Sequence, residues 1–324
     1  MPDITVVGSA NMDLVIGMER MVRAGETLPG GDLKLFPGGK GANQACAAAR
    51  LGGNVDMIAQ VGKDPFGSRL IASLTDAGVD TSRIGRVDRS TGCAVIYVLP
   101  NGRNAIVISP GANATLESAV ALSRLDRVQR GGYVLAQLEI PLETVAQVLA
   151  EARSRGAVTI LDPAPARQLT PEVLRNVDIL TPNQSEAAIL AGNGLRAIRD
   201  SRAAAEVAGL LLQLGVSAVV VKMGESGCVV RTSEFLAAVP GFQVTAVDTT
   251  AAGDVFNAAL AVALGEGRPL LEAAVFANAA GAICVTRAGA QSSIPSRAEL
   301  DAFLSERRDS IEIESMHPEK TCSS

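Results

Sequence analysis

The chain has 324 residues with 48% hydrophobic but only 3% aromatic side chains, a formal net charge of −5 and a pI near 5.2. This acidic balance provides no basic surface for nucleic acid or for an anionic membrane, so neither is expected as a partner. The one histidine, His317, lies in a polar C-terminal segment, which excludes a Ser-His-Asp triad, a Cys-His pair and a histidine-ligated zinc site.

The cysteines and the start of the chain indicate a compartment. The five cysteines are scattered and form no Cys-x-x-Cys pair, which is typical of buried thiols in a reducing environment. The N-terminus lacks a basic segment followed by an apolar stretch, and no apolar run approaches the roughly 18 residues that span a bilayer. We therefore expect a cytoplasmic protein.

Short apolar runs along the chain alternate with helical patterns. Strands are predicted at residues 4–7, 55–61, 133–137, 158–161, 179–180 and 218–221. Helices are predicted between them at residues 42–51, 66–77, 141–155, 185–190 and 203–214. This alternation predicts an α/β fold with a largely parallel sheet and helices on both faces. Ligands of such sheets bind beyond the carboxyl ends of the strands.

Two segments, residues 13–36 and 93–109, contain short β-like runs with no helix between them. Residues 94–98 and 105–108 predict a hairpin around the Asn-Gly turn at 101–102. Together these pieces predict a small antiparallel sheet that projects from the main body. Its apolar face would need cover from a ligand, the main body or a second subunit. Residues 305–324 are polar, and we expect a frayed or disordered tail.

The segment after the first strand, residues 8–13, reads GSANMD. Only Gly8 stands where a dinucleotide fold places G-x-G-x-x-G, which counts against NAD. Asn11 and Asp13 lie two residues apart and share one face if the segment is extended. They could then bind adjacent sugar hydroxyls, although a plain turn would also explain them.

A glycine-rich helix entry follows at residues 38–43, which read GGKGAN. It is not a Walker loop, because no Ser or Thr follows the lysine. The segment is either a flexible helix start or a binding loop in which Lys40 and Asn43 donate hydrogen bonds to a polyol.

Polar or glycine-rich loops recur after later strands, at residues 137–139, 162–166, 181–186 and 222–227. Asp162 is a rival carboxylate for a base or metal role. Asn183 and Glu186 stand at a helix start, where they suit phosphate or Mg²⁺-bound water, or where Glu186 completes a capping box.

The most informative segment is residues 248–254, DTTAAGD, which leads into a helix that starts near Gly253. A helix start presents unpaired amides and the positive end of the dipole, so it can hold phosphate oxygens. Asp254 is then placed where an alcohol would meet the γ-phosphate, as a phosphoryl-transfer base requires. The alternative is an acidic residue that caps an ordinary helix.

Taken together, these motifs make residues 3–304 resemble the ribokinase-like (PfkB-type) carbohydrate kinases. The two family signatures are residues 38–43 and 248–254, and the matches are closest to members that phosphorylate ribose. The resemblance implies a ribokinase-like three-layer α/β/α sandwich with a mostly parallel central sheet and a small β-sheet lid. The core would comprise residues 1–12, 37–92 and 110–304, and the lid residues 13–36 and 93–109.

The resemblance also implies a role for each motif residue. Asp254 would take the proton of the sugar O5 hydroxyl beside an anion hole at Gly253 and Ala252. The sugar-binding residues would be Asn11, Asp13, Gly39, Lys40, Gly41, Asn43 and Glu139. The ATP-binding residues would be Asn183, Lys222, Gly224, Glu225, Ser226, Gly227, Gly253 and Asn278. Two of these positions and one other depart from the family pattern. Asn278 and Lys222 stand where His and Thr are common, and Asp162 stands where Asn is common.

The implied cofactors are ATP, Mg²⁺ and K⁺. Glu186 would place Mg²⁺ through water. K⁺ would lie between two loops that contain Asp248, Thr250, Cys284, Arg287, Gly289 and Ser293. The implied reaction converts D-ribose and ATP to ribose 5-phosphate and ADP in a homodimer clasped through the lid. The same fold acting on deoxyribose, a nucleoside or a fructose-type sugar stays open, as does a catalytically silent sugar or nucleotide sensor.

Overall fold

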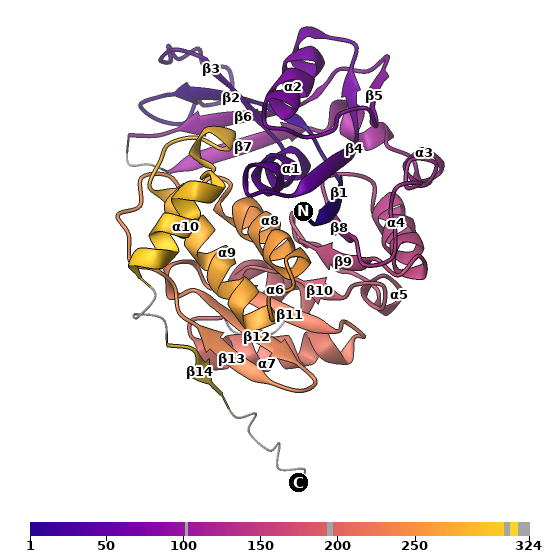
Figure 1. Cartoon of the computed structure of the whole chain (residues 1–324). Coiled ribbons are helices and arrows are strands. Elements are labelled where there is room, and N and C mark those ends of the chain that lie inside the picture. The colour runs from indigo at the N-terminus through magenta and orange to yellow at the C-terminus, as the bar shows by residue number, and fades with distance from the viewer. Residues whose placement is uncertain (101–102, 193–196, 308–311, 317–324) are drawn as a thin grey trace.

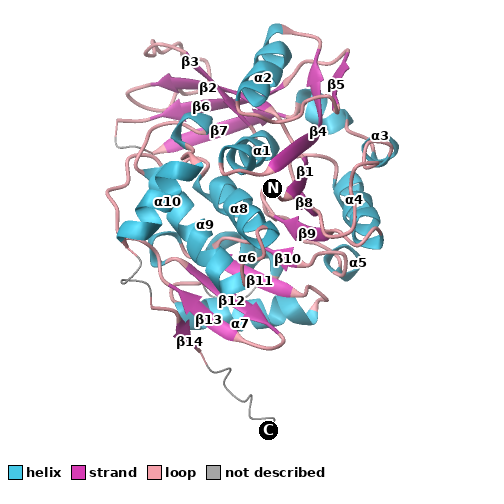
Figure 2. Ribbon diagram, viewed as in Figure 1, coloured by secondary structure: helices cyan, strands magenta, loops and turns pink. Residues whose placement is uncertain are grey.

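The computed structural model describes residues 1–100, 103–192, 197–307 and 312–316. Its main body has three layers, a large sheet with helices packed on both faces, and a small second sheet lies beside one end of it (Figures 1 and 2). The predicted α/β sandwich with a mostly parallel central sheet is confirmed. Within the described part of the chain, no helix is both long and apolar enough to cross a bilayer.

The large sheet has the strand order β14-β13-β12-β11-β10-β9-β8-β1-β4-β5. The strands from β11 to β5 are mutually parallel, and β12, β13 and β14 continue one edge in antiparallel fashion. The strands are β1 Asp3–Val7, β4 Asn54–Gly62, β5 Ile84–Val87, β8 Tyr133–Ala136, β9 Val158–Leu161, β10 Ile179–Leu180, β11 Ala218–Lys222, β12 Cys228–Thr232, β13 Leu236–Val239 and β14 Glu314–Ser315. The antiparallel edge and β5 were not predicted from the sequence.

Helices cover both faces of this sheet. One face carries α1 Lys40–Arg50, α2 Pro65–Asp76, α8 Ala252–Gly265, α9 Leu270–Val285 and α10 Arg297–Glu306. The other carries α3 Ser118–Leu122, α4 Leu142–Ser154, α5 Pro171–Leu174, α6 Gln184–Leu190 and α7 Ser201–Gln213. Successive strand residues point to opposite cores, as Val6 and Val7 of β1 do. The parallel strands are therefore apolar on both faces.

The small sheet has the order β3-β2-β6-β7, with β2 Asn11–Gly17, β3 Lys34–Gly38, β6 Gly92–Val98 and β7 Asn104–Ser109. The predicted β6–β7 hairpin is confirmed, although its turn at 101–102 lies outside the described residues. The prediction of an antiparallel sheet was wrong for one pair, because β2 and β6 run parallel. These two strands are far apart in sequence and meet through a crossover, which local turn signals do not reveal.

The tail prediction was also wrong in part. The helix α10 runs to Glu306, and Glu314 and Ser315 pair with Ala238 and Ala237 of β13. Backbone pairing to an otherwise open sheet edge orders this short polar segment, which has no apolar pattern of its own. The rest of the predicted tail, residues 308–311 and 317–324, lies outside the described residues.

Small side chains bring α1 and α8 together. Ala45, Cys46, Ala47 and Ala48 of α1 are fully buried, as are residues 258–263 of α8. Small residues allow two helices to pack closely, since little side-chain volume separates their backbones. The polar residues at the start of α1 are thereby held against the first turn of α8, where the functional site lies.

Candidate active site

Polar side chains gather at one edge of the large sheet. Ser9 follows β1, Glu139 follows β8, Asp162 follows β9, Asn183 follows β10, and Lys222 ends β11. These strands are parallel, so their carboxyl ends meet at one edge, together with the first turns of α1 and α8. The site therefore lies where the sequence predicted it, beyond the carboxyl ends of the strands.

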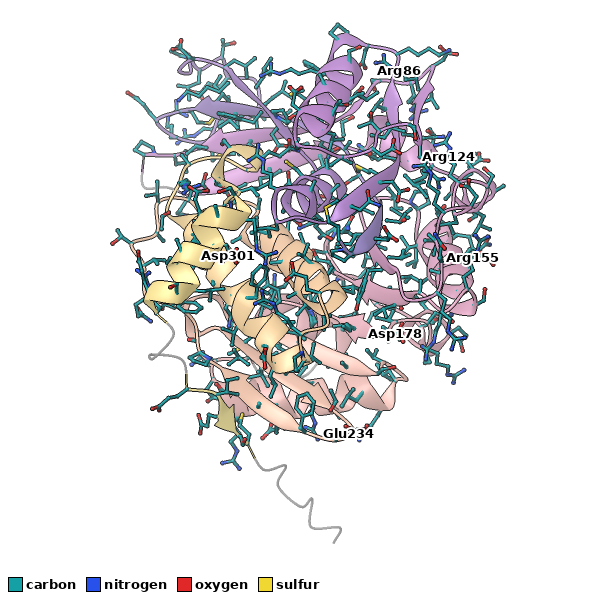
Figure 3. The ribbon with its side chains drawn as sticks, viewed as in Figure 1. Arg86, Arg124, Arg155, Asp178, Glu234 and Asp301 are labelled. Carbon is teal, nitrogen blue, oxygen red and sulfur yellow. The ribbon has the colours of Figure 1, made fainter. Side chains whose placement is uncertain are left out.

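Two carboxylates of this site are deeply buried. Arg86, Glu234 and Asp301, which Figure 3 labels, are exposed. Asp162 and Asp254, by contrast, are 2% and 5% exposed. A carboxylate held out of water in this way needs hydrogen-bond donors and a nearby cation.

The first turn of α8 has an unusual entry. Its N-cap, Ala251, has φ 62 and ψ 1, the left-handed conformation, and is the non-glycine residue with positive φ in the described part of the chain. No side chain caps the amides that follow. A strained residue and uncapped amides at a helix start are typical of a site that binds an anion.

Two side-chain amides at the start of α1 hold the Asp254 carboxylate. Asn43 Nδ2 donates to Oδ2 at 2.9 Å, and Gln44 Nε2 donates to Oδ1 at 3.2 Å. Gln44 Nε2 also donates to Asp162 Oδ2 at 3.1 Å, while Gln44 Oε1 accepts from Gln137 Nε2 at 2.7 Å. Because Gln137 fixes the orientation of Gln44, the Gln44 amide group faces both carboxylates as a donor.

The charges of Asp254 and Lys40 suit proton transfer. Burial raises the pKa of Asp254 to about 6, although Lys40 and the two amide donors act in the opposite direction. Burial alone would lower the pKa of Lys40, but the carboxylates of Asp254, Asp162 and Glu139 outweigh it and raise that pKa. A charged lysine thus lies near a carboxylate whose pKa is close to neutral, as a general base requires.

Glycines allow the loop after β1 to touch the start of α1. Gly39 has φ 90, and a Cβ there would lie 2.6 Å from the Asn11 backbone nitrogen. A Cβ on Gly41 would lie 2.6 Å from the Ser9 nitrogen. Both contacts are closer than a side-chain carbon can approach, so this packing requires glycine.

The remaining predicted sugar-binding residues lie around this contact. Asp13 packs on Gly38, and burial, with the charges of Glu139 and Asp254, raises the pKa of Asp13 to about 7. Glu139 accepts a hydrogen bond from Ser9 Oγ and another from the backbone nitrogen of Lys40, at 3.1 Å. The structure therefore brings together the residues that the sequence predicted for a polyol.

Some residues of this region were missed. Gln44 directly follows the glycine-rich segment, but no local pattern shows that its side chain reaches Asp254, 210 residues away. Asn113 donates from Nδ2 to Asn11 Oδ1 at 2.7 Å and accepts at Oδ1 from the Ala10 nitrogen at 2.9 Å. It lies in a 3₁₀ turn more than a hundred residues from Asn11, and no local pattern marks it.

Two cavities meet at the first turn of α8. The larger, about 540 Å³, is lined by Lys40, Asp162, Asn183, Gln184, Ser185, Glu186, Lys222, Gly224, Thr249, Ala251, Gly253 and Asp254. The smaller, about 370 Å³, has a mainly apolar wall and shares Lys222, Gly224, Thr249 and Gly253 with the larger. Asp254 thus faces a space that continues into a second, more apolar one.

The smaller cavity contains most of the predicted nucleotide residues. Gly224, Glu225, Gly227 and Asn278 line it, whereas Ser226 lines neither cavity. The loop after β13 supplies lining residues that the sequence did not suggest, which are Gly241, Phe242, Gln243, Val244 and Ala246. An apolar cavity with a few polar groups is typical of a small-molecule or cofactor site.

Asn278 fixes the loop after β13 against α9. Its Nδ2 donates to the Val239 oxygen at 3.3 Å and to the Pro240 oxygen at 3.1 Å. The Asn278 side chain therefore holds the cavity wall in place and also lines the cavity.

Asn183 and Glu186 form a capping box at the start of α6. The Glu186 nitrogen donates to Asn183 Oδ1 at 2.9 Å, and the Asn183 nitrogen donates to Glu186 Oε2 at 2.8 Å. Both residues also line the larger cavity. Burial and the charge of Asp162 raise the pKa of Glu186. Glu186 thus completes the capping box that the sequence left open, and it also lines the larger cavity.

The two loops predicted to hold a monovalent cation lie side by side. Asp248 Oδ1 accepts from the Thr250 nitrogen at 2.9 Å, and Oδ2 accepts from the Gly289 nitrogen at 2.9 Å. Cys284 Sγ lies 3.0 Å from Ser293 Oγ and 3.7 Å from the Thr250 oxygen. The Arg287 side chain points instead to Glu299, at 2.6 Å.

The chemistry of this loop pair fits a hard cation bound by oxygens. Over the described ranges, no group of three or more His, Cys, Asp or Glu side chains is arranged so that it could hold a metal ion. A cation here would depend on the Asp248 carboxylate, hydroxyls and backbone carbonyls, which are ligands that hard cations accept.

Comparison with known proteins identifies related chains. The model of the pfkB family carbohydrate kinases matches residues 1–297. The chain is 40% identical over 302 residues to the ribokinase of Haemophilus influenzae, covering 93% of this chain and 98% of that one. It is 40% identical over 305 residues to the ribokinase of Bacillus subtilis, covering 94% and 100%.

A solved structure shares the fold. The ribokinase of Arabidopsis thaliana, complexed with ribose and ATP, superposes with a TM-score of 0.87 at 33% identity, covering 94% of this chain and 98% of that one. A deoxyribokinase of Salmonella typhimurium is 36% identical over 308 residues, covering 94% and 99%.

Proposed function

Because this chain belongs to the pfkB family of carbohydrate kinases and is a sugar kinase, we propose that it phosphorylates D-ribose at O5. The products are ribose 5-phosphate and ADP. One observation carries the proposal. The buried carboxylate of Asp254 lies beside the uncapped amides of α8 and opens to a cavity that continues into an apolar one.

In this reaction Asp254 takes the proton of the O5 hydroxyl as the oxygen attacks the terminal phosphorus. The amides of Ala252 and Gly253 and the positive end of α8 stabilise the charge on the transferred group. Asn43 and Gln44 hold the carboxylate in place, so little reorganisation is needed when the proton moves.

Ribose is placed between the loop after β1 and the start of α1. Asn11, Asp13, Lys40, Asn43 and Glu139 offer donors and acceptors to its hydroxyls, and Gly39 and Gly41 allow close approach. The H. influenzae and B. subtilis ribokinases and the ribose complex of the A. thaliana ribokinase support this sugar over a nucleoside or a fructose-type sugar. Deoxyribose is the second candidate, because a deoxyribokinase is 36% identical.

ATP is placed with its base in the smaller cavity near Asn278 and its phosphates along residues 222–227 toward Gly253. Mg²⁺ bound to the phosphates neutralises their charge when it is present. Glu186 and Asn183 face the same space, where Glu186 would hold Mg²⁺ through water.

A panel of sugars tests the substrate. ADP release from Mg·ATP is measured with ribose, deoxyribose, ribonucleosides and fructose, and ribose is expected to give the highest kcat/KM. A tenfold preference for another acceptor would reject ribose, since one missing hydroxyl partner can change selectivity by orders of magnitude. Tight sugar binding without ADP release would instead favour a sensor.

Activity is expected to depend on K⁺. The cation would lie between the loops of Asp248 and Gly289, directly before the first turn of α8, and its removal would loosen the anion hole. Exchange of K⁺ for tetramethylammonium at equal ionic strength is therefore expected to lower kcat about tenfold or more. Equal kcat in both salts would remove the cation from the mechanism.

A homodimer through the small sheet is expected from its edge. Ile106, Val107 and Ile108 of β7 are 52%, 61% and 47% exposed, an unusual apolar run on an edge strand. Val107→Asp is expected to convert a dimer to a monomer by light scattering, because it buries a charge in the interface. Leu210→Asp on α7, an equally apolar exposed site at 42%, is the control and should leave the dimer intact. A native chain that is monomeric at micromolar concentration would contradict this assembly.

A further inference from the structure

Lys222 and Asp162 form an ion pair in the wall of the larger cavity. Lys222 Nζ lies 3.1 Å from Asp162 Oδ1, and the two side chains are 13% and 3% exposed. Both positions were singled out in the sequence as departures from the family pattern. Each is the partner of the other, so the added positive charge is balanced by a carboxylate rather than buried alone.

The Lys222 ammonium lies at the junction of the two cavities. Lys222 lines both of them, whereas Asp162 lines only the larger. A Cβ built on Gly253 would be 3.4 Å from Lys222 Nζ, so the ammonium lies beside the first turn of α8. The ammonium is therefore the charged group at the junction, beside Gly224, Thr249 and Gly253, which also line both cavities.

Asp162 is itself held in one orientation. Its Oδ2 accepts from Gln44 Nε2 at 3.1 Å, and Gln44 is fixed by Gln137. An ammonium has three N–H donors, and Asp162 takes one of them. The others can serve a ligand at the junction without breaking the ion pair.

We propose that Lys222 binds the terminal phosphate of the nucleotide, and that Asp162 is a positioning residue that keeps the ammonium at the junction. The proposal rests on the proposed function, which places the nucleoside in the smaller cavity and the reaction at Asp254. The terminal phosphate then lies between them, beside Gly253. Lys222 thereby makes the site prefer a nucleoside triphosphate to a diphosphate, which weakens inhibition by the product.

The test compares two nucleotides and needs no sugar. The dissociation constants of ADP and of the β,γ-imido analogue of ATP are measured by calorimetry with Mg²⁺. In the double variant Asp162→Asn/Lys222→Thr, which removes both charges together, the preference for the triphosphate is expected to fall about 10- to 100-fold. The affinities for ADP and adenosine should change less than about threefold.

Two single variants keep the test decisive. Lys222→Arg retains the charge and is expected to keep most of the preference. Lys222→Gln is neutral but can still donate a hydrogen bond to Asp162, so it should fold and lose the preference for the triphosphate. It therefore gives the same test if the double variant does not fold. An unchanged preference in Lys222→Gln, or an equal loss of ADP affinity, would overturn the proposal.

This readout is separate from the choice of sugar. If the native chain prefers the triphosphate but does not phosphorylate ribose, the proposed function fails and the role of Lys222 stands. If ribose is phosphorylated and the neutral variants keep their preference, the role of Lys222 fails alone.

Discussion

Asp254→Asn is expected to turn over ribose about 10²- to 10⁴-fold more slowly than the native chain, with ribose affinity nearly unchanged. The substitution removes the group that accepts the O5 proton but keeps the size of the side chain. The measurements are kcat from ADP release and the ribose dissociation constant from calorimetry.

The surroundings of Asp254 allow this variant to fold. Both carboxylate oxygens accept from amide donors, so an amide at this position would place its NH₂ against one of them. Asn43 Oδ1 is buried without a partner in the described structure, and rotation of the Asn43 amide would offer that oxygen to the new NH₂. The variant should therefore retain its packing.

Asp162→Asn is the matched control, because Asp162 is the rival carboxylate in the same cavity. It also accepts from Gln44, at 3.1 Å, and is as well buried. Because Asp162 also holds Lys222 beside the proposed nucleotide site, the comparison is made at saturating ATP. The base is assigned correctly if kcat of Asp162→Asn then stays well above that of Asp254→Asn. The reverse result would transfer the role of base to Asp162.

Lys40→Gln is expected to lower kcat/KM for ribose about 10²- to 10³-fold. It should also shift the acid limb of the pH profile, where kcat/KM falls with decreasing pH, to higher pH. The native chain needs Asp254 ionised, and because the pKa of Asp254 is raised to about 6, activity should be lost as pH falls through that value. Lys40 lowers this pKa, so its removal raises the pKa further, and a smaller fraction of the base is ionised at neutral pH.

The measurement is kcat/KM between about pH 5 and about pH 9 for both proteins. Lys63→Gln is the control, since Lys63 is an exposed lysine that pairs with Asp88 at 2.9 Å on the surface. It should change neither the rate nor the limb. An acid limb that stays at the native pH in Lys40→Gln would show that Lys40 does not act on the base.

The elements that were predicted correctly are those with a strong local pattern. Val158–Leu161 and Ile179–Leu180 have the predicted bounds, because buried parallel strands are short apolar runs between polar loops. α9, over Leu270–Val285, was missed although it is long. It is apolar around most of its circumference, so it has no helical periodicity to detect.

The candidate site divides in the same way. Lys40, Asn43 and Asp254 were found because each lies in a compact motif at a predicted helix start. Gln44 and Asn113 were missed because their roles depend on contacts with Asp254 and Asn11, which are 210 and 102 residues away. Such contacts are set by how the strands are ordered in the sheets, and no local pattern records them.

The connection of the small sheet to the catalytic helices has a mechanical consequence. Asn11 pairs with Gly38 inside that sheet, and the chain then turns at Gly39 directly into α1, which is fixed to α8. A rotation of the small sheet about Gly39 would carry Asp13 with it and leave Asp254 in place, whereas Asn11 at the base of the sheet is held by Asn113 at 2.7 Å. Closure of the small sheet would then bind the sugar and bring its hydroxyl to Asp254 in one movement. With the sheet only partly closed, the sugar would be bound but its hydroxyl would not reach the base.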